Sequence, residues 1–168
     1  MRYTLLFLLF TFHSFTVKAQ IKYTEKEAIN DLINSWHQAA SEANFTTYFE
    51  HFTDHAIFIG TDATENWSKK DFEAYAKPYF DKGKAWDFKT INRNIYFSSD
   101  KKTAWFDELL DTQMKICRGS GVLIKVKNKW KIAHYLLSIS IPNELMNEVI
   151  QLKKDSDDVL LEKIKNQQ

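Results

Sequence analysis

The chain has few of the residues that cross-link, break or loosen a fold. Among its 168 residues are one cysteine, two prolines and four glycines. A single cysteine excludes an internal disulfide, so Cys117 is predicted to be a buried, small apolar residue rather than a nucleophile. The scarcity of proline and glycine argues against long disordered linkers. Stability must therefore come from a hydrophobic core, and a chain of this length can bury one.

Neither sign of charge dominates the sequence. It has 23 basic against 22 acidic residues, with no basic cluster. Nucleic acid is therefore not expected as a partner, because binding to phosphates needs a basic surface. The sequence also lacks a glycine-rich phosphate loop, a nucleophile elbow and any cofactor motif, so no cofactor is expected.

No metal site is expected either. His51, Asp54 and His55 are close in sequence, but they span the end of a predicted helix and no metalloenzyme motif frames them. We expect these side chains to be solvated. His37, on the polar flank of the first predicted helix, is likewise expected to face solvent.

The long apolar run of this chain is at the N-terminus. Residues 5–12 are mostly apolar, Arg2 precedes them, and residues 17–19 (Val-Lys-Ala) have the small-x-small pattern that signal peptidase needs. The run is too short for a permanent membrane anchor. Residues 1–19 are therefore predicted to be a cleaved signal, which leaves a secreted or periplasmic protein without stable membrane insertion. The alternative is an uncleaved anchor.

Helical periodicity dominates the first half of the remaining chain. Thr24 starts a capping box, and apolar residues then recur at helical spacing. A short second helix is expected at 45–52 and a strand at 55–60, which a loop follows. A third helix is expected at 68–83, where Pro78 should kink or weaken it.

From Trp86 the apolar period changes to two, which predicts four strands up to Ile141. Helical periodicity returns in residues 143–168, as two short helices. Helices followed by an antiparallel meander predict one α+β domain at 20–142 with a C-terminal helical tail. We expect the sheet to curl around a cone-shaped cavity, with the N-terminal helices on its concave side.

Three polar residues of the last two strands are predicted on the covered face of the sheet. Alternation from Trp130 puts His134 on the apolar face, and pairing the strands around Asn128 sets Arg118 and Ser120 beside it. Arg118, Ser120 and His134 either bind an anion or polarise a carbonyl group of a ligand. The alternative is structural: Arg118 pairs with a carboxylate, and His134 bonds to a backbone group or a tyrosine.

Asp107 and Glu108 are candidate general bases. Residues 105–110 are apolar on both faces, so alternation leaves open which carboxylate points inward. A carboxylate in an apolar cavity has a raised pKa and suits proton transfer near neutral pH, with His134 and Arg118 polarising the substrate. The alternative is that either acid pairs with Arg118 or a lysine on the outer face.

Further ligand-binding candidates come from the rim of the expected pocket. Asp62, Glu65 and Trp67 follow the first strand, and they either close the mouth over a ligand or cap a turn and pack in the core. Tyr79 and Trp86 are candidate walls of the pocket, with packing as the alternative.

Four segments together resemble one family: FIGTDATENW, AWFDELL, RGSGVL and WKIAHYLLS. They are similar to the SnoaL-like domain, within the nuclear transport factor 2-like and ketosteroid isomerase-like superfamily, over about residues 24–145. The resemblance implies a cone-shaped α+β barrel, of the kind also called cystatin-like, which is often a homodimer with a pocket between sheet and helices. Members include polyketide cyclases, isomerases, hydratases and binding domains, so no single activity is implied.

The favoured prediction is an exported protein that binds a small, mostly apolar molecule and forms a homodimer through the outer face of its sheet. One alternative is a cofactor-independent isomerase, cyclase or lyase with Asp107 or Glu108 as general base. Another is a structural or partner-binding module whose cavity is filled by its own aromatic side chains.

Overall fold

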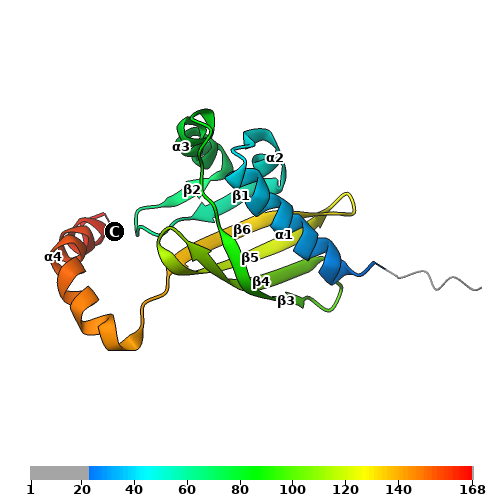
Figure 1. Ribbon diagram of the computed structural model, residues 1–168. Coiled ribbons are helices and arrows are strands. Elements are labelled where there is room, and N and C mark those ends of the chain that lie inside the picture. Colours follow the sequence, from blue (N-terminus) through cyan, green and yellow to red (C-terminus); the bar gives the residue numbers. More distant parts are fainter. Residues whose placement is uncertain (1–22, 168) are drawn as a thin grey trace, which may run out of the picture.

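A computed structural model describes residues 23–167 of the chain (Figure 1). The predicted signal at 1–19 lies outside these residues. The elements, in chain order, are α1 (Glu25–Ser41), α2 (Phe45–Glu50), β1 (Phe52–Ile59), β2 (Asn66–Ser68), α3 (Lys69–Asp81), β3 (Lys89–Phe97), β4 (Thr103–Thr112), β5 (Lys115–Val126), β6 (Lys129–Ile139), a 3-10 turn η1 (Asn143–Leu145) and α4 (Met146–Lys165).

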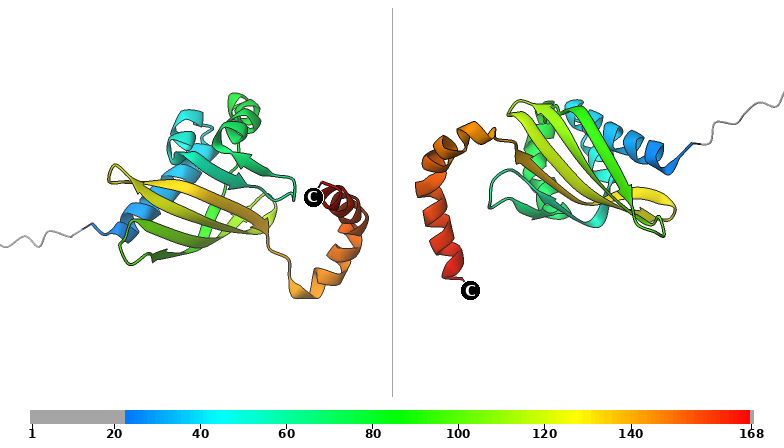
Figure 2. Two further views of the ribbon diagram at one scale, coloured as in Figure 1. Left: turned by 180° about the vertical axis from the view of Figure 1, so that it is seen from behind. Right: turned by 90° about the horizontal axis from the view of Figure 1, so that it is seen from below.

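The strands form one curved sheet of six, in the order β2-β1-β6-β5-β4-β3. Strands β3 to β6 are the predicted antiparallel meander, and β1 joins β6 in parallel. Helices α1, α2 and α3 cover one face, while Figure 2 shows the other face uncovered. The predicted α+β class, with a curved sheet covered by N-terminal helices, is confirmed.

The helix starts follow from local side-chain chemistry. At α1, Thr24 Oγ1 accepts from the Glu27 backbone N–H at 3.2 Å, and Glu27 Oε2 accepts from the Thr24 N–H at 2.6 Å. This confirms the predicted capping box. Ser68 caps α3, and Pro78 lies inside that helix without ending it.

Two local predictions were wrong. The expected loop at 61–67 contains the start of β2, which pairs with β1. The C-terminal tail is one long helix, α4, rather than two short ones, and none of its residues is buried. From the end of β6 the chain turns so that the second half of α4 lies beside Ala63 in the loop between β1 and β2 (Figure 1). Of the helices in residues 23–167, none combines the length and apolar character that crossing a bilayer needs.

A β-bulge in β6 reverses the faces that alternation predicted. His134 pairs with Val122 as expected, but Ile132 pairs with Leu123, so Ala133 is an extra residue on β6. One added residue moves every later side chain of a strand to the opposite face. His134 therefore lies on the outer face of the sheet, and its neighbour Tyr135 is buried beneath the helices.

Aromatic side chains fill most of the space between the sheet and the helices. Trp36 of α1 stacks on Tyr48 of α2, with 5.2 Å between ring centroids, and Tyr135 meets Trp36 edge-on at 4.7 Å. Cys117 is buried, as predicted. The fully or nearly buried rings are Trp36, Tyr48, Phe49, Phe52, Phe58, Phe72, Phe80, Phe106, Trp130 and Tyr135. Open space therefore remains only toward the edges of this core.

Candidate functional site

A cavity of about 180 Å³ lies between α3, the sheet and the turn that joins β4 to β5. Its walls are mainly aromatic and come from β1, β2, α3 and the segment after α3, with Met114 and Leu137 completing the apolar part. The aromatic lining residues are Phe58, Trp67, Phe72, Tyr75, Trp86 and Phe88. The polar side chains in the lining are few: Thr61, Glu65 and Gln113.

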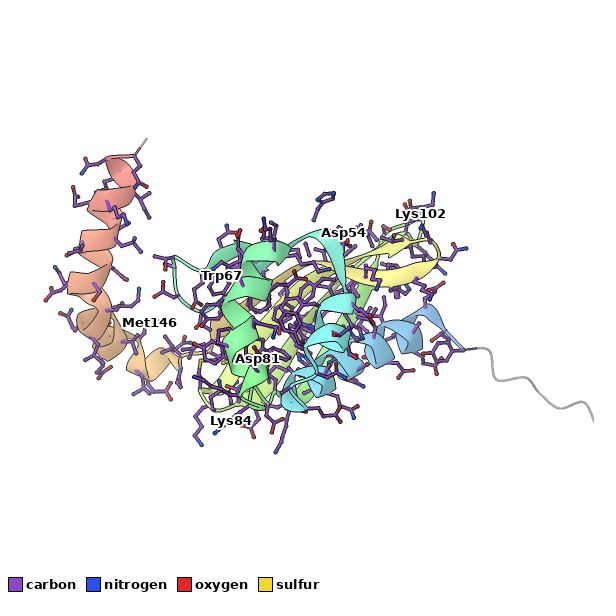
Figure 3. The ribbon with its side chains drawn as sticks, turned by 90° about the horizontal axis from the view of Figure 1, so that it is seen from above. Asp54, Trp67, Asp81, Lys84, Lys102 and Met146 are labelled. Carbon is purple, nitrogen blue, oxygen red and sulfur yellow. The ribbon has the colours of Figure 1, made fainter. Side chains whose placement is uncertain are left out.

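Phe72 is the centre of a stack of nearly parallel rings. Its ring centroid lies 3.9 Å from that of Phe58, 5.6 Å from Trp67 and 5.8 Å from Trp86, with interplanar angles of 16°, 14° and 21°. Figure 3 labels Trp67 beside α3. The two predicted tryptophans, Trp67 and Trp86, therefore both lie in the cavity wall, and both also pack in the core.

Two other predicted rim residues lie outside the cavity lining. The Asp62 carboxylate accepts hydrogen bonds from the Thr64 hydroxyl at 2.5 Å and from its backbone N–H at 2.8 Å, and these bonds lower the pKa of Asp62. Asp62 thus caps its own turn, the alternative that the sequence left open. Tyr79 is 45% exposed and contacts Tyr75 on the outside of α3.

Glu65 is the acidic residue of the lining. Its Oε2 accepts a hydrogen bond from the Asp62 backbone N–H at 3.1 Å. The carboxylate also folds back over Gly60, where a Cβ atom would collide with it. The loop between β1 and β2 therefore holds a carboxylate in a fixed position at the cavity wall.

Glu108 points inward from β4 but is enclosed by donors. Its Oε1 accepts from His37 Nε2 at 2.9 Å and from the Tyr135 hydroxyl at 3.2 Å. Its Oε2 accepts from Arg93 Nε at 2.9 Å and from Arg93 Nη2 at 2.8 Å. Both carboxylate oxygens are thus fully bonded within the protein.

The pKa of Glu108 follows from these contacts. Burial raises the pKa, but the hydrogen bonds and charges of His37 and Arg93 outweigh it and hold the pKa below its ordinary value of 4.5. The expectation that an inward carboxylate has a raised pKa is therefore wrong for Glu108. It is an ionised carboxylate in a buried network, and it is absent from the lining of the aromatic cavity.

The sequence analysis missed the partners of Glu108. His37 is buried, so the prediction that it faces solvent was wrong. It lies four residues after Ile33 on α1, at the edge of the apolar face, and that spacing was the available signal. Arg93 also donates to Asn34 Oδ1 on α1 at 2.9 Å. His37 and Asn34 of α1 thus contact β4 and β3, and His37 is buried there whereas Asn34 stays exposed.

The remaining predicted residues share one face of the sheet, but it is the outer face. Arg118 is 54% exposed on the outer face, and its Nη1 lies 3.9 Å from Asp107 Oδ1. Ser120 Oγ donates to the Phe106 carbonyl at 3.1 Å, and His134 is half-buried on that same face. Because β6 carries the bulge, the prediction that Arg118, Ser120 and His134 lie beneath the helices was wrong. The contact between Asp107 and Arg118 agrees with the alternative that one of the two acids pairs with Arg118 on the outer face.

Of the three side chains near the end of α2 that were expected to be solvated, Asp54 and His55 are exposed but His51 is not. His51 is half-buried rather than solvated, its Nδ1 lies 2.6 Å from the Thr47 carbonyl oxygen, and burial lowers the pKa of His51. Within residues 23–167, no three His, Cys, Asp or Glu side chains are grouped so that they could hold a metal ion.

Comparison with known proteins gives one family and one fold. The sequence model of the SnoaL-like domain matches residues 29–142. Among curated proteins, none matches this sequence. The matched range contains the aromatic cavity and the buried network around Glu108.

Solved structures share the architecture at low sequence identity. A domain of unknown function with a cystatin-like fold from Nostoc punctiforme has a TM-score of 0.61 and 15% identity, over 84% of this chain and 94% of that one. An NTF2-like protein from Cytophaga hutchinsonii has a TM-score of 0.59 and 14% identity, over 70% and 99%. An NTF2-like protein of unknown function from Pseudomonas putida has a TM-score of 0.58 and 14% identity, over 69% of this chain and 87% of that one. At these identities the likeness shows the fold alone.

Proposed function

Because this chain belongs to the SnoaL-like domain family, we propose that it binds a small, mostly apolar molecule in the aromatic cavity beside α3. Membership supports a ligand-binding or isomerase-type domain, and the cavity supports the first of these. The observation that carries the proposal is a void walled by aromatic side chains, with few polar groups to orient a ligand.

The size of the cavity limits the ligand. An apolar cavity of about 150 Å³ accommodates benzene. The cavity here measures about 180 Å³, which corresponds to a molecule of roughly six to eight non-hydrogen atoms. We therefore propose a ligand of one small ring or an equivalent branched group rather than a polycyclic substrate.

The contacts of the acidic candidates favour binding over proton transfer. A general base needs a free lone pair within reach of the substrate. Glu108 accepts four hydrogen bonds from the protein, and Asp107 lies on the opposite face of the sheet from the cavity. The alternative of a structural or partner-binding module with a filled cavity is supported only in part. Aromatic rings fill the deep core, but the space beside α3 is open.

Blocking the cavity mouth is expected to abolish binding. Met114, on the β4–β5 turn, lines the cavity and is half-buried, so Met114→Trp fills the void at little cost to the core. Native mass spectrometry of the purified protein is expected to show a co-purified small molecule on the wild type and none on Met114→Trp.

The same spectra give the mass of the chain, which we expect to begin at Gln20 after export through the signal at 1–19.

The matched control for this experiment is Met146→Trp. Met146 is exposed at the start of α4, outside the cavity lining. This variant is expected to retain the ligand as the wild type does. Equal retention by Met114→Trp and Met146→Trp would contradict the proposed site.

A homodimer through the outer face of the sheet is part of the same proposal. Monomeric proteins seldom leave a large continuous apolar patch in solvent. The outer face carries exposed or half-buried apolar side chains from four neighbouring strands: Tyr96, Trp105, Leu109, Ile116, Val122 and Leu136. Tyr96 and Trp105 stack on each other, with 5.9 Å between centroids, near the ends of β3 and β4 that their connecting turn joins.

A charge on this face is expected to separate the proposed dimer. Trp105→Glu puts a carboxylate into the apolar patch, and burial of an unpaired charge is costly. Sedimentation velocity is expected to show a dimer for the wild type and a monomer for Trp105→Glu. Leu152→Glu, at an 85% exposed position on α4, is the control and should remain dimeric. A monomeric wild type at micromolar concentration would rule the dimer out.

A further inference from the structure

We infer that the molecule bound in the aromatic cavity is a small organic cation, an ammonium group on a compact apolar body. This inference rests on the proposed function, because it names the class of ligand for the same cavity. It comes from the charge of the lining, which the apolar character of the cavity does not explain.

The first support is a carboxylate at the cavity wall that has no basic partner. Among the ion pairs of residues 23–167, none within 4.0 Å includes Glu65. Glu65 is half-buried, and its one side-chain hydrogen bond comes from the Asp62 backbone N–H. A cationic ligand would supply the charge partner that this partly buried carboxylate lacks within the protein.

The second support is the position of that carboxylate. Its Oε2 is tied to the Asp62 N–H and packs closely on Gly60, where the missing Cβ leaves room for it. The loop therefore holds Glu65 against the cavity wall, although an exposed glutamate would ordinarily extend into water. A fixed charge binds a ligand with less loss of side-chain entropy than a mobile one.

The third support is the aromatic wall. Tryptophan and tyrosine rings attract a cation over their faces at distances up to about 6 Å, with tryptophan the strongest. Trp67 stacks against Tyr75 at 4.5 Å, and Trp86 lies in the same ring stack through Phe72. Trp67, Tyr75 and Trp86 line the cavity together with Glu65, so an ammonium group bound there lies among aromatic rings and beside a carboxylate.

The other lining residues fit the same class of ligand. No lysine or arginine is in the lining, and its remaining polar side chains, Thr61 and Gln113, are neutral. An anionic ligand would meet Glu65 without a compensating base, and a neutral ligand would leave Glu65 unpaired. The volume suits choline, which has seven non-hydrogen atoms, within the roughly six to eight that the cavity admits.

A pair of probes of equal shape tests the charge. Choline has a positively charged quaternary nitrogen at the position where 3,3-dimethylbutan-1-ol has a neutral quaternary carbon. Isothermal titration calorimetry of the full mature chain is expected to show choline binding about tenfold more tightly, or better, than the neutral alcohol. In Glu65→Gln the two affinities are expected to agree within about twofold, because the charge preference is lost.

Two further variants keep the test independent of folding. Glu73→Gln removes a carboxylate from α3 outside the lining and should keep the preference for choline. Gly60→Ala retains the Glu65 charge but displaces its carboxylate, so the preference should fall as in Glu65→Gln. Thermal unfolding of each variant identifies any loss that comes from misfolding.

The outcomes separate the inference from the proposed function. Equal binding of both probes by the wild type, or an unchanged preference for choline in Glu65→Gln, overturns the inference of a cationic ligand. The proposed cavity for small apolar molecules then still stands. The wild type could also bind neither probe but carry a neutral co-purified molecule that Met114→Trp loses. That result overturns the inference of a cationic ligand and leaves the proposed function standing. No bound molecule of any kind on the wild type overturns both.

Discussion

Replacing Glu108 with alanine is expected to lower the free energy of unfolding by about 3–5 kcal/mol, because it leaves a buried cation without its counterion. The Arg93 side chain is 4% exposed and that of Glu108 is not exposed at all. In the variant, Arg93 and the donors of His37 and Tyr135 lose their common acceptor. Urea denaturation at neutral pH measures the change.

The neighbouring carboxylate provides the control. Asp107 lies next to Glu108 on β4, but it faces outward, and its contact with Arg118 spans 3.9 Å between half-exposed groups. Asp107→Ala is expected to cost less than about 1 kcal/mol, as is usual for surface ion pairs. Equal losses for Glu108→Ala and Asp107→Ala would contradict the assignment of Glu108 to a buried network.

The same network gives the stability of the wild type a defined pH dependence. Since the pKa of Glu108 is lowered in the folded chain, the unfolded chain binds more protons near and below the ordinary value of 4.5. The stabilisation is thus complete above that value and is lost as the pH falls through the folded pKa. Glu108→Gln has no such proton to gain, so the stability difference between it and the wild type should shrink in acid. A difference that stays constant with pH would refute this.

Replacing Gly121 with alanine is expected to cost about 3 kcal/mol, because the added methyl group has no space on the inner face of β5. Its Cβ would lie 2.6 Å from Phe106 Cε1 and 2.8 Å from the His134 carbonyl oxygen. The ring is buried in the core, and the carbonyl belongs to the backbone of the adjacent strand. Neither can move without disturbing the pairing of β5 with β6.

Ser120→Ala is the matched control for Gly121→Ala. Ser120 precedes Gly121 but points to the outer face, where its hydroxyl bonds to the Phe106 carbonyl. Loss of one such exposed hydrogen bond should cost about 1 kcal/mol or less. The midpoint of urea denaturation compares the two variants, and a Gly121→Ala midpoint equal to that of Ser120→Ala would show that the strand adapts to the methyl group.

Most of the fold could be predicted from the sequence, because periodicity and capping act over short distances. The capping box at Thr24, the start of the third helix near residue 68 and the strand meander all appeared where expected. The parallel pairing of β1 with β6 could not be predicted, since no local pattern specifies which strand a preceding element joins. The bulge at Ala133 was also hidden, because the sequence around it alternates normally for either register.

The candidate site was predictable only in part, for the same reason. Trp67 and Trp86 could be named because large aromatic residues near a predicted pocket either line it or pack in the core, and both do so. The inward direction of Glu108 was left open, and its partners His37, Arg93 and Tyr135 come from three other elements, α1, β3 and β6. The pairing that puts Arg118, Ser120 and His134 on one face was correct, because opposite residues of paired strands share a face whichever face that is.

The hydrogen bonds of Glu108 also bear on how the chain reaches its final form. His37 and Glu108 are separated by 71 residues, and Glu108 and Tyr135 by 27. These groups meet only after α1 has docked on an assembled β3–β4–β6 surface, in one rotational setting about the helix axis. A small rotation of the docked helix would keep part of its apolar contact but would move His37 and Asn34 away from Glu108 and Arg93. The buried charges thus select a single orientation of α1 that hydrophobic packing alone would specify less sharply.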